Sequence, residues 1–188
     1  MTEEGVPFAS AAAWEAWLAE HHADADGIWV RFAKKASGIP TVVYAEAVHE
    51  ALRYGWIDGH TKRIDDDWYI QRFTPRRARS RWSKINCAKA EALIASGAMQ
   101  PAGLAEVERA KADGRWDAAY DSPSTATVPD DLAAALDAAG VTEAFAALSG
   151  QNRYASLHRV QTAKRPETRA RRIEKYVAML AAGETPHP

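Results

Sequence analysis

The chain has 188 residues, 47% of them hydrophobic, and a formal net charge of −1. Seven Trp, six Tyr and four Phe supply enough large apolar side chains for a core, which excludes a disordered chain. No run of about 18 apolar residues occurs, so membrane insertion is not expected. The one cysteine, Cys87, excludes an internal disulfide and a cysteine-based zinc site.

The start of the chain does not have the pattern of a signal peptide. Met1–Pro7 lacks a basic start, and Ala9–Glu20 is amphipathic. Walker-type loops, dinucleotide fingerprints and the His-Glu-x-x-His pattern are all missing from the sequence. We therefore expect a cytoplasmic globular protein with no cofactor and no bound metal.

Charge is segregated along the chain. Residues 72–89 carry seven basic side chains and no acidic one, and residues 153–175 carry eight basic and two acidic side chains. Such blocks attract anions only where they stay exposed. They bind an outside anion, or they pair with acidic segments of the same chain, and the sequence leaves both readings open.

The first half of the chain predicts two helices and three strands. Ser10–Glu20 is a helix with Ser10 as N-cap, and Tyr44–Tyr54 is a helix that ends at a glycine. Alternating apolar residues predict a strand at Gly27–Lys34 and two more at His60–Ile64 and Trp68–Thr74. On the last strand, one set of alternate residues must face away from the other set.

The second half is helical by pattern. We expect helices at residues 83–96, 101–112, 130–139, 142–148, 152–162 and 167–182. The sequence therefore predicts an α+β fold: a small antiparallel sheet packed with helices, followed by an all-helical C-terminal unit. The expected domains are an N-terminal domain at 1–115 that carries the candidate site, a linker at 116–128 and a helical module at 129–188.

Two glycines bracket a tryptophan and an aspartate in Gly55-Trp56-Ile57-Asp58-Gly59, which is followed by His60 and Arg63. The segment is expected to be a loop between a helix and a strand, where functional side chains are common. Asp58 is then a candidate general base or orienting group. The alternative is that Asp58 stabilises a turn and Trp56 is part of the core.

Arginines dominate residues 72–81, directly before a predicted helix that begins near Ser83. Guanidinium groups bind carboxylate or phosphate oxygens, and free N–H groups at a helix start add partial positive charge. The segment is therefore a candidate anion site. The alternatives are a solvated basic loop, or arginines paired with the acidic turn at Asp65–Asp67.

Other chemistries have weaker support. Glu46, His49 and Glu50 share a helix face, but an ordinary solvated face explains them better than a metal site. Cys87 is expected to be a small buried residue rather than a nucleophile. The aromatic residues Tyr69 and Phe73 next to a basic loop would suit single-stranded nucleic acid, which the net negative charge of the chain disfavours.

Three segments together resemble a known family. They are Tyr44–Gly59 with its Gly-Trp-Ile-Asp-Gly motif, Arg72–Asn86 with its Trp-Ser-Lys-Ile-Asn motif, and Ala163–Lys175 with its Arg-Arg-Ile-Glu-Lys motif. These segments are similar to the YdeI/OmpD-associated family of bacteriocin-protection proteins, over about residues 8–183. The resemblance implies a protein of stress or antimicrobial protection with a small helical C-terminal module. It implies no reaction and no catalytic residues.

The sequence thus predicts a pocket for a small anionic or polar ligand. Asp58 is its orienting or basic group, and the expected ligand-binding residues are Trp56, His60, Arg63, Tyr69, Arg72, Arg76, Arg77, Trp82, Ser83, Lys84 and Asn86. One alternative is an enzyme that acts on a small anionic substrate with Asp58 as general base. Another is a module that binds a partner protein or single-stranded nucleic acid.

Overall fold

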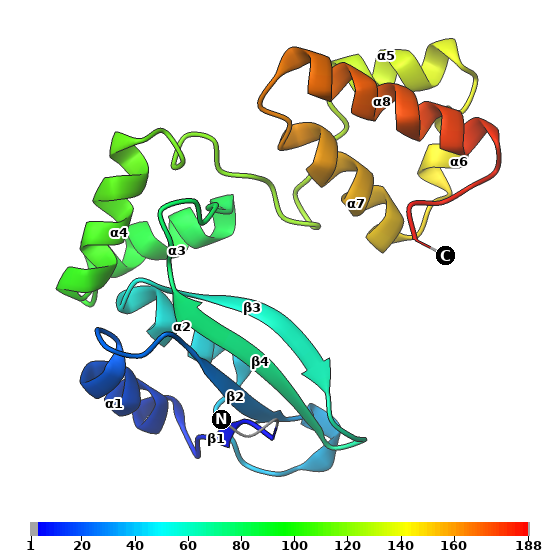
Figure 1. Ribbon diagram of the computed structural model, residues 1–188. Helices are drawn as coiled ribbons and strands as arrows, with labels where there is room; N and C mark the ends of the chain where they lie inside the picture. The colour runs from blue at the N-terminus through cyan, green and yellow to red at the C-terminus, as the bar shows by residue number, and fades with distance from the viewer. Residues whose placement is uncertain (1–3, 188) are drawn as a thin grey trace. The chain divides into compact units, whose positions relative to one another are not determined.

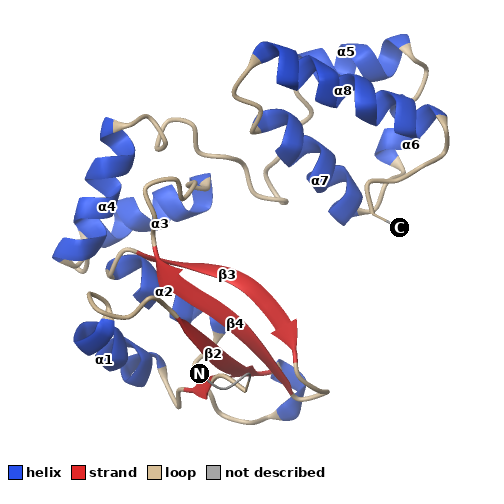
Figure 2. Ribbon diagram, viewed as in Figure 1, coloured by secondary structure: helices blue, strands red, loops and turns tan. Residues whose placement is uncertain are grey.

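A computed structural model describes residues 4–187 (Figure 1). The chain forms two compact units. The first comprises the residues up to Trp82 together with Asn86–Ala118, and the second comprises Ser83–Ile85 and the residues from Ala119 onward. A sheet and helices build the first unit and helices alone build the second, which confirms the predicted α+β fold (Figure 2).

The first unit has a four-stranded sheet in the order β1-β2-β4-β3. Its elements are β1 (Val6–Pro7), α1 (Ala11–His21), β2 (Ile28–Ala33), the 3-10 turn η1 (Lys35–Ser37), α2 (Tyr44–Arg53), β3 (Trp56–Arg63), β4 (Trp68–Pro75), α3 (Lys84–Ala95) and α4 (Pro101–Ala112). The short edge strand β1 runs parallel to β2, and the other pairs are antiparallel. The prediction for the first half missed β1 and η1.

The two predicted N-terminal helices cover one face of the sheet. The Ser10 side chain accepts a hydrogen bond from the N–H of Ala13 (3.2 Å), so it is the N-cap of α1 as predicted. Trp14 of α1 is fully buried, and its Nε1 donates to the carbonyl oxygen of Ala47 in α2 (3.0 Å). The core between these helices and the sheet also contains Val30 and Phe73.

The strands have two chemically different faces. Ile28, Val30 and Phe32 of β2 lie in the core, where the register pairs them with Phe73, Gln71 and Tyr69 of β4. The alternate residues of both strands, among them Trp29 and Arg72, lie on the other face. The predicted alternation along β4 is therefore confirmed.

Strand β3 begins at Trp56, four residues earlier than the sequence predicted, so the Gly-bracketed segment is strand rather than loop. Trp56 and Ile57 pair with Pro75 and Thr74 of β4. The register shifts between Asp58 and Thr61, and this β-bulge contains the second glycine. The glycine pattern that indicated a loop thus marks the bulge.

The second unit contains α5 (Asp130–Ala138), α6 (Thr142–Ala146), α7 (Gly150–Gln161) and α8 (Pro166–Ala181). All four lie where helices were predicted. Their core contains Leu132, Phe145, Val160 and Tyr176. Ile173, Val177 and Leu180 of α8 pack in this core, where Tyr176 of the same helix is more deeply buried.

The boundary between the units falls at Ala118–Ala119, within the irregular stretch between α4 and α5. The sequence placed a linker at 116–128. Ser83–Ile85 join the second unit because Ser83 forms a β-bridge with Tyr120 and the N–H of Lys84 donates to the Tyr120 carbonyl oxygen (2.9 Å). A domain boundary drawn at a single point in the sequence would place these three residues in the first unit.

Candidate functional site

Trp56 is a core residue. Only 1% of its surface is exposed, its ring packs edge-on against Trp17, and its Nε1 donates to the carbonyl oxygen of His22 (3.1 Å). The strand register places it on the helix-covered face of the sheet. The structure therefore gives Trp56 a packing role.

Asp58 lies on the same helix-covered face, opposite Phe73. Its carboxylate is half-buried and accepts a hydrogen bond from the hydroxyl of Tyr44 (2.6 Å). His60 follows in the bulge and is exposed. Arg63 lies at the exposed end of β3, where it forms an ion pair with Asp66, and its Nε donates to the carbonyl oxygen of Asp65 (3.0 Å).

Tyr69 faces the core side of β4. Its ring stacks on Phe32 with centroids 5.3 Å apart. Burial raises the pKa of the Tyr69 phenol, so its hydroxyl stays protonated at neutral pH. Tyr69 and Asp58 thus share a face of the sheet, and Arg72 points to the other one.

Arg76 is buried, with 4% of its surface exposed. Its guanidinium lies 3.6 Å from the centroid of the Trp82 ring, and its Nη1 donates to the carbonyl oxygen of Arg81 (3.1 Å). Trp82 is also buried and packs against Trp116. Because both side chains are enclosed, this pair fixes the base of the loop. Arg77, in contrast, is exposed.

Lys84 is paired internally in the second unit. Its Nζ lies 2.7 Å from Oδ1 of Asp121, and Nε2 of Gln161 donates to Oδ2 of the same carboxylate (2.5 Å). The hydrogen bond from Lys84 is the main reason that the pKa of Asp121 is lowered. Ser83, the residue before Lys84, is buried, and Asn86 is half-buried. The start of α3 therefore contributes to the packing of the second unit.

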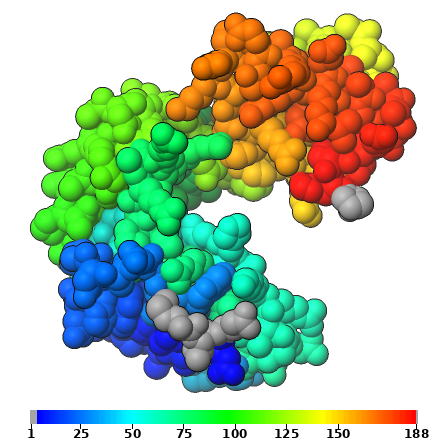
Figure 3. Space-filling view, viewed as in Figure 1, coloured from blue at the N-terminus to red at the C-terminus, as the bar shows by residue number. Residues whose placement is uncertain are grey.

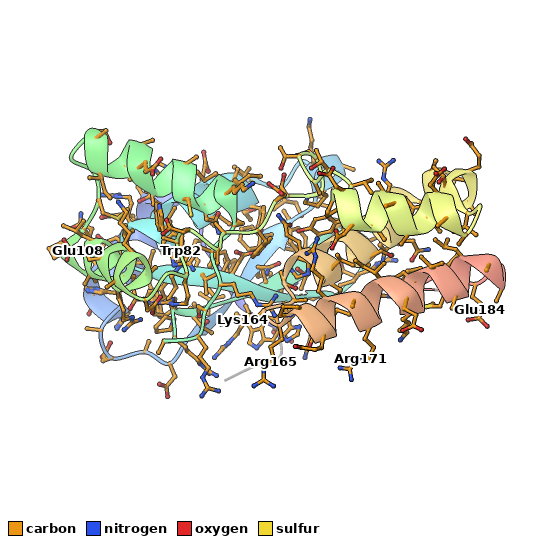
Figure 4. The ribbon with its side chains drawn as sticks, turned by 90° about the horizontal axis from the view of Figure 1, so that it is seen from above. Trp82, Glu108, Lys164, Arg165, Arg171 and Glu184 are labelled. Atoms are coloured by element: carbon orange, nitrogen blue, oxygen red, sulfur yellow. The ribbon has the colours of Figure 1, made fainter. Side chains whose placement is uncertain are left out.

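The basic block at residues 153–175 also contains both paired and exposed arginines. Arg169 forms a two-pronged ion pair with Asp131, through Nε to Oδ2 (2.6 Å) and Nη2 to Oδ1 (2.8 Å). Arg165 and Arg171 point away from the helices into the surroundings (Figure 4). Paired and exposed arginines thus occur within one helix.

Arg72 lines a cavity of about 370 Å³ in the first unit. Its lining combines the arginine with two tryptophans, one carboxylate and small or apolar residues: Gly5, Val6, Trp17, Ala25, Asp26, Gly27, Ile28, Trp29 and Arg72. Of these lining residues, only Arg72 was predicted from the sequence as a ligand-binding residue. Trp29 lies directly across from Arg72 on the neighbouring strand.

Gly27 makes room for the arginine. Its φ of +130° lies in a region that favours glycine, and a Cβ there would lie 2.9 Å from Nη2 of Arg72 and 2.6 Å from the carbonyl oxygen of Phe73. Within residues 4–187, the Arg72 guanidinium has no hydrogen bond and no ion pair; its closest aromatic contact is with the Trp29 ring, 5.9 Å away. This cation is therefore available to a ligand.

A second cavity, of about 580 Å³, lies between α5 and α8 of the second unit. Ala135, Ile173 and Val177 make most of it apolar, and the Asp131–Arg169 ion pair lies at its margin. Its charged groups already neutralise each other. This cavity offers little to an anion.

Several other chemistries find no support in the described residues. Cys87 is buried, and burial raises the pKa of its thiol to about 11, which keeps the sulfur protonated at neutral pH. No three His, Cys, Asp or Glu side chains among residues 4–187 lie together as metal ligands would. None of the helices described there is long and apolar enough to cross a membrane.

Trp17, Trp29 and the Ala25–Gly27 loop line this cavity although no motif in the sequence pointed to them. Alternation along β2 already set Trp29 apart from the apolar residues of that strand. Local sequence patterns did not reveal the strand pairing that brings Trp29 to Arg72, because η1, α2 and β3 lie between β2 and β4 in the chain.

Comparison with known families divides the chain much as the structure does. Residues 6–106 match a family described as a domain of unknown function (DUF8412). Residues 125–183 match the family described as Bacteriocin-protection, YdeI or OmpD-Associated. Two of the three segments of the sequence resemblance therefore fall in the first match, and only Ala163–Lys175 falls in the second.

No curated protein and no solved structure matches the chain. The two family models together cover both compact units, and the first of them covers more than half of the chain. The chain belongs to the DUF8412 family and carries a C-terminal domain of the YdeI/OmpD-associated, bacteriocin-protection family.

Proposed function

We propose that this bacteriocin-protection-type protein binds a small anionic or polar ligand in the Arg72 cavity. The observation that carries the proposal is the state of Arg72, whose guanidinium lines the cavity without an ion pair or hydrogen bond in residues 4–187. A guanidinium keeps its charge at any physiological pH and offers several N–H donors. An anion in the cavity would supply the missing acceptors.

The other residues that line the cavity limit the chemical class of the ligand. Trp17, Trp29 and Val6 form apolar walls, which favour a ligand with a flat or apolar body beside its acidic group. Asp26 adds one carboxylate to the lining. A ligand that also carries a hydrogen-bond donor fits Arg72 and Asp26 better than a bare anion. The volume of about 370 Å³ suits a small molecule.

The proposed site is lined by arginine and tryptophan, as the sequence predicted, but most of its residues differ from the predicted ones. Arg72 stays as the anion anchor. Trp17 and Trp29 replace Trp56 and Trp82 as aromatic walls, because the latter two are enclosed in packing. Asp58 is not among the residues that line this cavity, so the proposed binding does not use it.

The test is a thermal-shift panel on the purified chain, followed by calorimetry on any compound that raises the melting temperature. The panel contains aliphatic and aromatic carboxylates, amino acids, phosphate and nucleotides, at low and moderate salt. A ligand bound only by the folded state raises the melting temperature by mass action. We expect a salt-tolerant shift from a small acid with an apolar body.

Arg72→Met keeps an unbranched apolar stem and removes the charge. The variant is expected to weaken binding by about tenfold or more, the effect of losing a charge-assisted hydrogen bond. Arg79→Met, on the exposed loop, is the matched control and should bind as the parent does. Equal binding by both variants, or no shift with any compound, would refute the proposal.

A further inference from the structure

Away from the helices α1 and α2, the sheet presents a face of aromatic and basic side chains. This open face consists of Trp29 and Arg31 of β2, Lys62 of β3, and Trp68, Ile70 and Arg72 of β4. Atoms of β3 and β4 reach the surface of the first unit in the space-filling view (Figure 3, cyan to green). Only Ile70 is buried there, beneath Gly5, where an added Cβ would lie 2.6 Å from Cγ2 of Ile70.

Aromatic rings, not carboxylates, hold the cations of the open face. The guanidinium of Arg31 lies 4.4 Å from the centroid of the Trp68 ring, and Nζ of Lys62 lies 5.0 Å from that of Trp29. Such contacts leave the positive charge uncancelled. Neither Arg31 nor Lys62 has an ion pair in the part of the chain that the structure describes.

The open face is also free of acidic strand residues. The positions of β2, β3 and β4 that alternate onto it are apolar, aromatic, hydroxyl-bearing or basic, and Asp58 belongs to the opposite face. Nε of Arg31 is buried without a hydrogen-bond partner in residues 4–187. Because this Nε is enclosed, the open face offers an anion the charge of the guanidinium and not this N–H donor.

We propose that the open face binds single-stranded nucleic acid. Arg31, Lys62 and Arg72 bind successive phosphates, and bases stack on the accessible parts of the Trp29 and Trp68 rings. Single strands expose their bases to aromatic residues on a sheet, and basic side chains beside those residues follow the backbone. An acidic peptide would use the cations but not the two indole rings.

The net charge of the whole chain is no obstacle to this surface. Salt screens exposed charges beyond about 8 Å at physiological ionic strength, so the local charge of the open face matters most. The sequence disfavoured nucleic acid on the total charge and assigned any such binding to the loop after β4. The structure provides a different surface, on three paired strands.

Fluorescence anisotropy with a labelled 12-nucleotide dT strand tests the proposal on the full chain. Three phosphate contacts predict that the logarithm of the binding constant falls with the logarithm of salt concentration with a slope near −2. The double variant R31Q/K62Q should bring this slope near −0.7 and weaken binding at least tenfold at low salt.

The control R79Q/R81Q makes the same change in charge on exposed loop residues of the same unit. It should bind the strand like the parent. Equal loss in both double variants would show unspecific attraction, and loss in the loop variant alone would move the site to the loop. Either result overturns the proposal. Lys62→Gln changes only an exposed residue, so it tests the surface even if the double variant is unstable.

Trp68→Phe and Trp68→Leu separate stacking from charge. The leucine variant should bind dT about tenfold more weakly, the phenylalanine variant should retain most of the affinity, and binding of inorganic polyphosphate should stay unchanged in both. Equal affinity for polyglutamate, or for duplex DNA of the same length, would overturn the assignment to single strands. R31Q/K62Q leaves Arg72 in place, so it should still bind the small ligand of the cavity.

Discussion

Arg72 and Arg76 lie four residues apart and reach opposite environments. Arg72 is half-buried at a cavity without an acidic partner in residues 4–187, and Arg76 is enclosed over the Trp82 ring. The difference follows from the end of β4. The chain leaves the sheet at Pro75, and the N–H of Arg76 donates to the carbonyl oxygen of Gly55 (2.9 Å), which turns its side chain inward.

Arg76 should therefore matter for stability. Arg76→Ala removes the contact with Trp82 and leaves a void beside a buried ring, so we expect the free energy of unfolding to fall by about 2–3 kcal/mol. Arg77→Ala, at the next and exposed position, should change it by less than about 0.5 kcal/mol. Urea denaturation measures both. Equal effects would contradict a packing role for Arg76.

At the scale of elements, the contact of α2 with α4 depends on a glycine. A Cβ on Gly103 would lie 2.2 Å from the carbonyl oxygen of Arg53 and 2.5 Å from Sδ of Met99. Since a backbone atom cannot move aside cheaply, only glycine permits this approach. Packing therefore requires glycine at position 103, although glycine is unfavourable inside a helix.

Gly103→Ala is expected to lower the free energy of unfolding by about 1–3 kcal/mol, because the clash outweighs the gain of about 1 kcal/mol in helix propensity. Gly150→Ala is the matched control: it lies in the first turn of α7, and a Cβ there meets no atom within 4 Å. That substitution should stabilise the protein by up to about 1 kcal/mol. Chemical denaturation of the two variants gives the signs, and a stabilising Gly103→Ala would contradict the packing described.

On the scale of the whole molecule, two ion pairs tie segments distant in sequence within the second unit. Lys84 pairs with Asp121, and Arg169 pairs with Asp131. Hydrogen bonds from these partners lower the pKa of each aspartate. Both carboxylates therefore bind protons less readily in the folded state than in the unfolded chain.

The lowered pKa values of the two aspartates determine how the stability of the protein depends on pH. The stabilisation by Asp121 and Asp131 is complete above the pKa of an unfolded aspartate, near 3.9, and is lost as the pH falls through the lower folded values. Asp121→Asn should flatten the acid limb of stability, measured as the urea midpoint from about pH 7 to pH 2. Asp137→Asn, on the exposed side of α5, should leave that limb unchanged. A parent-like limb in Asp121→Asn would count against the pair.

Much of the fold could be predicted from local pattern. The start and end of α4 agree with the prediction, because a proline at the first position favours helix initiation there. Ser10 begins α1 for the same kind of local reason. Strand β3 was less predictable, since its first residues are a strand only because Pro75 and Thr74 lie beside them.

Local spacing determined where helices and strands occur, that the fold is α+β, and which residues of β2 and β4 share a face. Tertiary structure alone decided that Trp29 meets Arg72, that Trp56 and Trp82 are enclosed, and that Lys84 is neutralised by Asp121. The reason is physical: secondary structure depends on neighbours within a few residues, whereas a binding surface depends on strand register and helix packing between segments far apart in the chain.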